Sequence, residues 1–139
     1  MKDEKHDEKS LGKDEAEIRR ICEQIRNSDP SILSLTIAGA NGTIIAHSYG
    51  KEYEQEYLER ASKVRERAGA WAALMLGIEY ETDDVFGETE CIVRVHKKGK
   101  LMVVPFNSKK MVLAMLTTRD AHEIDLLPEI QPLLAMLEA

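Results

Sequence analysis

The sequence predicts one α+β domain, a five-stranded antiparallel sheet with helices on its faces. Two observations carry this prediction: the pair Asn41-Gly42 lies between two β-rich runs, and three further β-rich runs follow one another later with short polar connections. Segments with apolar residues at helical spacing precede the first runs, separate the two groups and end the chain. The expected order is α-β-β-α-β-β-β-α, and 139 residues are enough for one such core.

The N-terminal region is expected to hold a charged tail and then an amphipathic helix. Residues 1–13 carry acids and lysines with almost nothing apolar, so they cannot offset the entropy of ordering, and we expect a mobile tail. The folded domain is therefore expected at residues 14–139. Apolar residues at helical spacing predict a helix that begins at Asp14 and ends before Pro30: Ile18, Ile21, Cys22 and Ile25.

A β-hairpin is predicted next, because the runs 32–38 and 43–47 flank Asn41-Gly42. Asn-Gly is the pair that a type I′ turn favours, since both central residues of that turn need positive φ. A long helix over 53–78 follows, and its second half, AGAWAALMLG, is apolar nearly all round. That half has to be covered on more than one side.

The acidic stretch 79–88 is expected to be a solvated loop, because it lacks the D-x-D-x-D-G order of a calcium-binding loop. Three strands then form a meander over 89–95, 100–106 and 111–117. Pro105 cannot donate a ladder hydrogen bond, so it should lie near a strand end or a bulge.

The C-terminal segment, HEIDLLPEIQPLLAML, is apolar and is interrupted by two prolines. We expect a short helix that ends near Leu127 and a last turn or two from Pro132, with Leu133, Leu134 and Leu137 pointing inward. Docking on the chain's own sheet is the expectation. Insertion into a partner's groove as a detachable helix is the alternative.

Composition and charge argue against several classes of function. The net charge is -6 and the basic residues are interleaved with acids, which disfavours binding to nucleic acid or to an anionic membrane surface. No signal peptide is visible, and the longest apolar run falls far short of the ~20 residues that span a bilayer, so we expect a cytoplasmic protein. Cys22 and Cys91 give neither a disulfide framework nor a zinc site, and both should be reduced.

A search for catalytic groups finds none that the sequence brings together. Both Gly-rich phosphate-binding motifs are missing. Cys91 and His96 lie on one predicted strand at an odd separation, which sends their side chains to opposite faces. A lone histidine on a strand, such as His47 or His96, is more often structural than catalytic. We therefore expect no enzyme activity, no catalytic residue, no cofactor and no metal site.

Three segments carry a resemblance to a known family: ILSLTIAGANGTIIAHS, AGAWAALMLG and TECIVRVHKKGKLMVVPFNSKKMVLAML. In their order and hydrophobic pattern they resemble the roadblock/LC7 domain, which is close in shape to longin and profilin-like domains. The resemblance covers roughly residues 14–137. The charged leader and the charged start of the long helix depart from the family pattern, and they leave the subfamily and the partner open.

The resemblance implies a dimer, either of two identical chains or with a paralogous roadblock subunit. In such a dimer the strand 89–95 pairs with its mate and the long helices pack side by side. The sequence fits this arrangement, because that strand has an apolar edge that a monomer would have to protect. The residues expected in the dimer interface are Cys91, Ile92, Val93, Val95, Trp71 and Met75.

The resemblance also implies a regulator or scaffold for a small Ras-like GTPase. Such a protein acts by contacting switch segments and shifting their population, which requires no chemistry of its own. Activation, nucleotide exchange and plain tethering all stay open. The residues expected to contact the partner are charged and lie on the outer side of the long helix: Glu59, Lys63, Glu66 and Arg67.

Two other functions remain as alternatives. A profilin-like domain that senses a small molecule in a signalling pathway would need a polar-lined cavity between sheet and helix. An enzyme with an unrecognised site would need a strongly shifted pKa in a cleft near His47 or His96.

Overall fold

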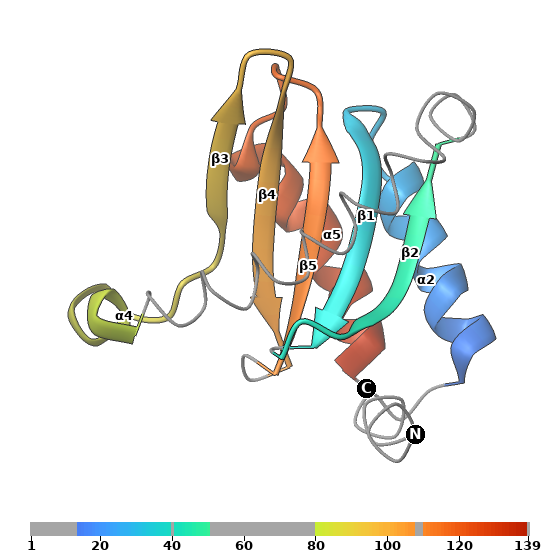
Figure 1. Cartoon of the computed structure of the whole chain (residues 1–139), viewed down its shortest axis with the longest axis horizontal. Helices are drawn as coiled ribbons and strands as arrows, with labels where there is room; N and C mark the ends of the chain where they lie inside the picture. Colours follow the sequence, from blue (N-terminus) through green and yellow to red (C-terminus); the bar gives the residue numbers. More distant parts are fainter. Residues whose placement is uncertain (1–13, 40, 51–79, 108–109, 139) are drawn as a thin grey trace.

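The computed structural model describes residues 14–39, 41–50, 80–107 and 110–138 (Figure 1). Its elements follow the order α-β-β-α-β-β-β-α, which confirms the predicted fold class. The predicted tail at 1–13 and the predicted long helix at 53–78 lie outside the described residues. The elements are α2 (Glu15–Asn27), β1 (Ile32–Gly39), β2 (Ile44–Tyr49), α4 (Tyr80–Phe86), β3 (Ile92–His96), β4 (Gly99–Phe106), β5 (Met111–Thr117) and α5 (Glu123–Glu138).

The five strands form one antiparallel sheet in the order β2-β1-β5-β4-β3. The predicted meander is confirmed, because β3 pairs with β4 and β4 pairs with β5. β1 inserts between β2 and β5, so the hairpin and the meander share a single sheet. β2 and β3 are therefore the two edge strands, at opposite sides of the sheet in Figure 1.

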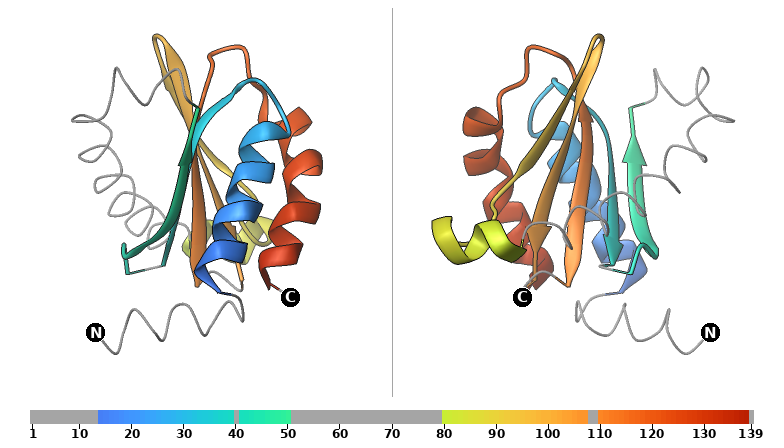
Figure 2. Two further views of the ribbon diagram at one scale, coloured as in Figure 1. Left: turned by 90° about the vertical axis from the view of Figure 1, so that its right-hand side faces the viewer. Right: turned by 60° about the vertical axis from the view of Figure 1, so that its left-hand side comes forward.

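The helices α2 and α5 lie side by side on one face of the sheet (Figure 2). Asp14 begins α2, because its carboxylate accepts a hydrogen bond from the Glu17 amide at 2.8 Å and so satisfies one of the first free N–H groups. The buried stripe of α2 consists of the four residues predicted from the sequence: Ile18, Ile21, Cys22 and Ile25.

The main core lies between this helix layer and the sheet. Apolar residues of the central strands point into it, and all are fully buried: Leu35, Ile37, Met102, Leu113 and Met115. Isoleucine, leucine and methionine dominate the core, as the scarcity of aromatic residues in the sequence indicates.

The opposite face of the sheet is also apolar and buried. Successive residues of a strand point to opposite faces, so Ala38, Val103 and Val112 point away from α2 and α5. Each of them is at most 1% exposed. Ile92 at the β3 edge packs against this second cluster. Both faces of the sheet therefore carry buried apolar residues.

The predicted hairpin is present, but its turn is longer than a type I′ turn. Gly39 donates its amide to the Thr43 carbonyl at 2.8 Å, which leaves three residues between the paired ends. Gly42 has a φ of 89°, whereas Asn41 is not in the positive-φ region. The Asn41 side chain instead accepts a hydrogen bond from the Thr43 amide. Three-residue hairpin loops need one left-handed residue, and Gly42 supplies it.

The prediction of a loop over 79–88 is wrong for most of its length, because α4 occupies Tyr80–Phe86. Gly87 ends this helix: it has a φ of 89° and its amide bonds to the Asp83 carbonyl at 2.9 Å. A glycine in this conformation directly after a helix is a common C-terminal stop.

β3 begins at Ile92, three residues later than predicted, and it runs to His96. Pro105 explains the late start. In the β3–β4 register, Ile92 faces Val103, so Glu90 would face Pro105. That position requires a backbone N–H from β4, which proline lacks. Pro105 itself pairs with Val112 near the end of β4, as expected for a proline close to a strand end.

α5 is one continuous helix with Pro128 and Pro132 inside it, not two short pieces. Each proline removes one backbone hydrogen bond, but both side chains lie on the exposed side of the helix. The opposite side is held in the core by residues at spacings of three and four: Leu126, Ile130, Leu134 and Leu137. Packing on the sheet thus maintains the helix across both prolines.

Among the described helices, none has the length and apolar character needed to cross a membrane.

Candidate functional site

The candidate site is the outer edge of the sheet at β3. Among the described residues, no strand pairs with β3 on the side opposite to β4. β3 and β4 are joined by the two-residue turn Lys97-Lys98, and His96 pairs with Gly99. The turn is held in place because Arg119 donates a hydrogen bond to the Lys97 carbonyl at 3.1 Å.

The backbone of β3 alternates in the direction of its polar groups. A two-residue turn is flanked by a hydrogen-bonded pair, so the N–H and C=O groups of His96 point toward β4. Alternation then directs the corresponding groups of Val93, Val95 and Cys91 toward the outer edge. The residues that present their backbone at this edge are therefore all apolar.

The four predicted interface residues of this strand lie together at the edge. Val95 is 60% exposed, whereas Cys91, Ile92 and Val93 are half-buried. Cys91 and Val93 pack against the core on the helix face, and Ile92 packs against the second face. The remaining predicted residues lie outside the described residues: Trp71 and Met75 of the interface, and Glu59, Lys63, Glu66 and Arg67 of the partner contact.

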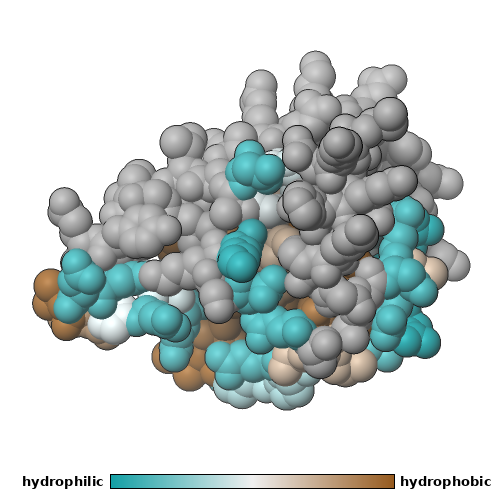
Figure 3. All heavy atoms as spheres, turned by 90° about the horizontal axis from the view of Figure 1, so that it is seen from below, coloured by the Kyte–Doolittle hydropathy of each residue, from teal (hydrophilic) through white to brown (hydrophobic). Residues whose placement is uncertain are grey.

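α4 extends the apolar surface of this edge. It protrudes from the body of the molecule beyond the start of β3 (Figures 1 and 2). Val85 and Phe86 on it are 74% and 83% exposed. Seen from below, hydrophobic atoms form the left-hand end of the molecule, where α4 lies (Figure 3). Sequence reasoning missed this feature, although Val85-Phe86-Gly87 interrupts an otherwise acidic stretch.

Hydrogen bonds attach α4 to the segment that leads into β3. The Asp83 carboxylate accepts bonds from the Thr89 amide at 3.1 Å and from the Thr89 hydroxyl at 2.5 Å. The backbone N–H of Asn107 donates a hydrogen bond to the Glu138 carboxylate at 2.5 Å, and this bond joins the end of β4 to the end of α5.

A groove of about 620 Å³ opens where β3 has diverged from β4. It lies between the segment after α4, the end of β4 and the last turns of α5. Apolar residues such as Phe86, Pro105 and Leu134 line it. Three carboxylates also line it, from Glu88, Glu90 and Glu138, and none of its described lining residues is a lysine or arginine.

The candidate nucleophile and bases are not brought together. His47 lies on β2, where its ring contacts that of Tyr49 with centroids 4.9 Å apart, whereas Cys91 and His96 lie at the other edge of the sheet. Burial raises the pKa of the Cys91 thiol to about 12, and Glu123 adds to the effect. Cys22 in the core is raised to about 12 for the same main reason. Both thiols are therefore protonated at neutral pH.

A second groove, of about 550 Å³, lies between α2 and β2. Polar and charged residues line most of it, including Arg19, Glu23 and His47. Arg26 donates a hydrogen bond across it to the Ser48 hydroxyl at 2.8 Å. Within the described ranges, no group of three or more His, Cys, Asp or Glu side chains is arranged to hold a metal ion.

Comparison of the sequence with protein-family models and with curated proteins finds no match. Comparison of the structure with solved structures finds several. A roadblock/LC7 domain from Streptomyces avermitilis superposes with a TM-score of 0.65 at 16% identity, covering 83% of this chain and 89% of that one. Myxococcus xanthus MglB gives a TM-score of 0.66 at 14% identity, covering 88% of this chain and 92% of that one.

A further structure, described as MglB with a tetrameric arrangement, gives a TM-score of 0.69 at 11% identity and covers 86% of this chain and 83% of that one. The identities are too low to carry a function across, but the shared architecture extends over most of both chains. The strand order, the helix layer and these similarities agree: the chain has the roadblock/LC7 fold.

Proposed function

We propose that this chain is a non-catalytic, dimeric interaction module that regulates or scaffolds a small Ras-like GTPase. The observation that carries the proposal is the β3 edge, where apolar residues present a backbone edge that no described strand pairs with and α4 presents two exposed apolar side chains. Natural edge strands are normally protected by charges, proline or a covering element. The residues that present their backbone at this edge, Cys91, Val93 and Val95, are neither charged nor proline; the charged residues lie at Arg94 and at the two ends of the strand.

The apolar area at this edge is sufficient to matter for association. Val85, Phe86 and Val95 are all more than half exposed. Full burial of such side chains contributes about 1.5–3 kcal/mol each. About a quarter of their surface is already buried, so three from each of two copies supply about 10 kcal/mol. Association itself costs about 4–15 kcal/mol in lost freedom. Backbone pairing and further contacts must therefore add to the apolar ones.

The absence of catalysis is part of the proposal. It is supported by the two raised thiol pKa values and by the position of His47 at the far edge of the sheet from Cys91. The GTPase is proposed because of the roadblock resemblance, in which such a partner is common. The feature that best fits the small-molecule alternative is the α2–β2 groove, which lies between a helix and the sheet and is lined mostly by polar and charged residues.

The first experiment measures the solution mass by light scattering for the wild type, Val93→Glu and Val95→Glu. We expect a dimeric wild type and monomeric variants, because each variant places two carboxylates in the shared edge. Val95 is the more exposed of the two, so its variant tests the edge even where Val93→Glu perturbs folding. Ile124→Glu is the matched control, since Ile124 is 78% exposed on α5. A monomeric wild type contradicts the proposal.

The second experiment tests the partner. Ras-like GTPases from the same organism, loaded with GDP or a non-hydrolysable GTP analogue, are tested for capture by the wild type and by the monomeric Val95→Glu variant. We expect the dimer to capture one nucleotide state preferentially and to change hydrolysis or exchange. Binding of none of them in either state contradicts the GTPase part and leaves the dimer as a separate result.

A further inference from the structure

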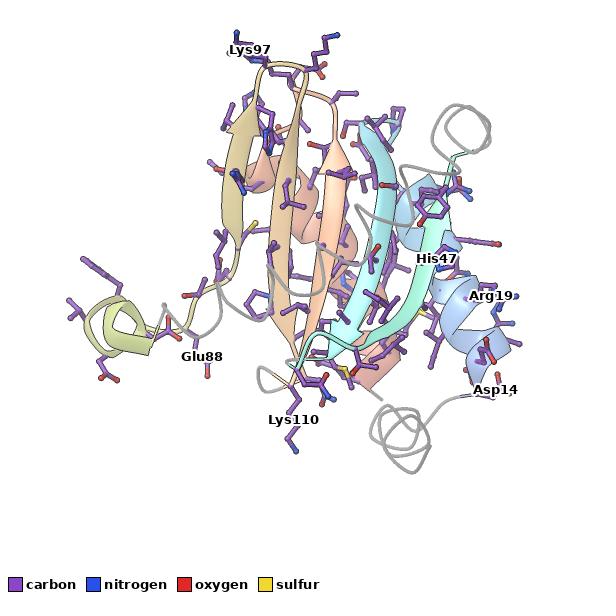
Figure 4. The ribbon with its side chains drawn as sticks, in the orientation of Figure 1. Asp14, Arg19, His47, Glu88, Lys97 and Lys110 are labelled. Carbon is purple, nitrogen blue, oxygen red and sulfur yellow. The ribbon has the colours of Figure 1, made fainter. Side chains whose placement is uncertain are left out.

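The β3 edge carries opposite charges at its two ends. Glu88 and Glu90 precede the strand, and Lys97 and Lys98 form the turn that follows it. All four side chains are exposed. Figure 4 shows Glu88 at one end of β3, beside α4, and Lys97 at the far end of the β3–β4 hairpin. The edge is therefore acidic where the strand begins and basic where it ends.

An antiparallel pairing of two such edges joins unlike charges. When β3 of a second copy lies beside β3 about a two-fold axis, the start of each strand meets the end of the other. Each acidic end then faces a basic end, and the contact occurs twice. A parallel pairing would bring acid to acid and lysine to lysine, which is destabilising.

The axis position follows from side-chain direction and charge. A two-fold axis perpendicular to the sheet lies midway between the two strands, and one residue then lies directly opposite its own copy. An axis is named below by that residue. An axis at Arg94 would place two guanidinium groups opposite each other. An axis at Val95 would place Lys97 opposite Val93 and leave the acids without partners. An axis at Ile92 would leave Ile92 as the one β3 residue that faces a β3 residue of the other copy, because the strand begins there. An axis at Val93 avoids all three problems.

With the axis at Val93, the outward backbone groups of its two copies form a hydrogen-bonded pair. Glu88 lies five residues before Val93 and Lys98 five residues after it. Glu88 lies before the start of β3 and the Lys97-Lys98 turn follows its end, so the axis brings the acidic end of each copy beside the lysine turn of the other. Within β3, Val93 then faces its own copy and Ile92 faces Arg94. The acidic segment before Ile92 lies beside the end of the other copy's β3 and its Lys97-Lys98 turn.

The groove beside α4 is the receiving surface in this arrangement. Its carboxylates come from Glu88, Glu90 and Glu138, and no lysine or arginine is among its described lining residues. A lysine side chain combines an apolar stem with a charged head, which suits apolar walls such as Phe86 and an acidic rim. The hydrogen bond from Arg119 to the Lys97 carbonyl fixes the turn that carries the two lysines.

We propose that the chain pairs with a second copy of itself with Val93 on the two-fold axis, and that the Lys97-Lys98 turn of each copy closes the acidic groove of the other. This rests on the proposed dimeric function and specifies its register and its charged contacts. The occupant of the groove is a second copy because the complementary lysines are on the same chain, at the opposite end of the same edge strand.

A charge-swap experiment tests the proposal. One variant carries Glu88→Lys and Glu90→Lys, and the other carries Lys97→Glu and Lys98→Glu. Alone, each faces like charges at both junctions, so we expect the dimer dissociation constant to rise by about tenfold to 100-fold at low salt. An equimolar mixture restores unlike charges at both junctions and should form a heterodimer close to wild-type affinity, measured by sedimentation and native mass spectrometry.

The control variant carries Arg19→Glu and Arg20→Glu, which reverse two exposed charges on α2 and should leave the dimer unchanged. A dimeric wild type whose affinity neither variant alters overturns the charged junctions but leaves the dimer. Weakened variants that do not recover on mixing overturn the self-complementary register. A monomeric wild type overturns the dimer itself, and with it this proposal.

Discussion

Disulfide trapping across the proposed joint gives a direct measure of its register. The perturbation is Val93→Cys in a Cys91→Ser background, which leaves one thiol near the edge. With Val93 on the axis, the two introduced cysteines form a hydrogen-bonded antiparallel pair. Their Cα atoms are then about 5.5 Å apart, inside the ~4.4–6.8 Å range of disulfides.

Neighbouring positions supply the comparison. With the same axis, two copies of residue 94 are offset by two residues along the strands, which separates their Cα atoms by about 8 Å. Two copies of residue 95 are offset by four residues, or about 14 Å. Arg94→Cys and Val95→Cys in the Cys91→Ser background should therefore cross-link much more slowly than Val93→Cys, since disulfides need a separation below about 7 Å.

The assay is the rate of covalent dimer formation under a mild oxidant, followed on non-reducing gels and by mass spectrometry. The assay is repeated with an excess of Cys91→Ser protein, which has no thiol at the edge. This protein replaces the second copy in the dimer, so it should slow trapping within the dimer and leave cross-linking by random collision unchanged. Faster cross-linking of Arg94→Cys than of Val93→Cys would refute the axis at Val93. Equal, slow cross-linking at all three positions would refute the pairing of β3 with its copy.

Other perturbations test the fold itself. Gly99→Ala places a Cβ 2.6 Å from the Thr117 carbonyl oxygen, so urea denaturation should show a loss of about 1–3 kcal/mol; an unchanged midpoint contradicts this contact. Ile130→Ala removes a fully buried α5 side chain and should cost about 2–5 kcal/mol, more than the ~1 kcal/mol expected for loss of the helix cap in Asp14→Ala. Because burial raises the pKa of Cys91 to about 12, its alkylation at pH 8 should be far slower in native than in unfolded protein and should accelerate as the pH rises. Equal rates, measured on the Cys91 peptide by mass spectrometry, would show that the thiol is not buried.

Local patterns were sufficient to predict most of the sheet and its first helix. The stripe of α2 is visible because its four buried residues fall at helical spacing and charged residues occupy the other face. The hairpin was predicted from Asn41-Gly42, but its turn type was not, because the loop length depends on which residues of β1 and β2 pair. Register is a property of two strands and is weakly encoded in either one.

The errors occur where distant residues decide the structure. α5 runs through two prolines because Leu126, Ile130 and other residues of its inner face are buried against the sheet, which local propensity does not include. α4 is only seven residues long, too short for a periodic signal, and Gly87 at its end was the one available indication. Neither helical periodicity nor the glycine at the helix end predicts that Val85 and Phe86 are exposed.

Pro105 accounts both for the error in the predicted start of β3 and for the groove at the candidate site. The sequence indicated that this residue lies near a strand end, but not that its position across the sheet ends the pairing of β3. Because β4 cannot donate a hydrogen bond there, the chain before Ile92 leaves the sheet, and the groove with Glu88 and Glu90 opens beside it. A prolonged strand would have filled this space with its own backbone.

The same geometry bears on the choice between a homodimer and a heterodimer. In a two-fold dimer each contact occurs twice, so one chain has to carry both halves of every complementary pair. A subunit that pairs with a paralogue is free of this requirement, since the complementary charges can be on its partner. This chain carries acids at one end of β3 and lysines at the other. We infer that self-pairing is the arrangement that uses both, and that added salt should weaken the wild-type dimer more than it weakens the dimer of a variant whose four end charges are neutralised.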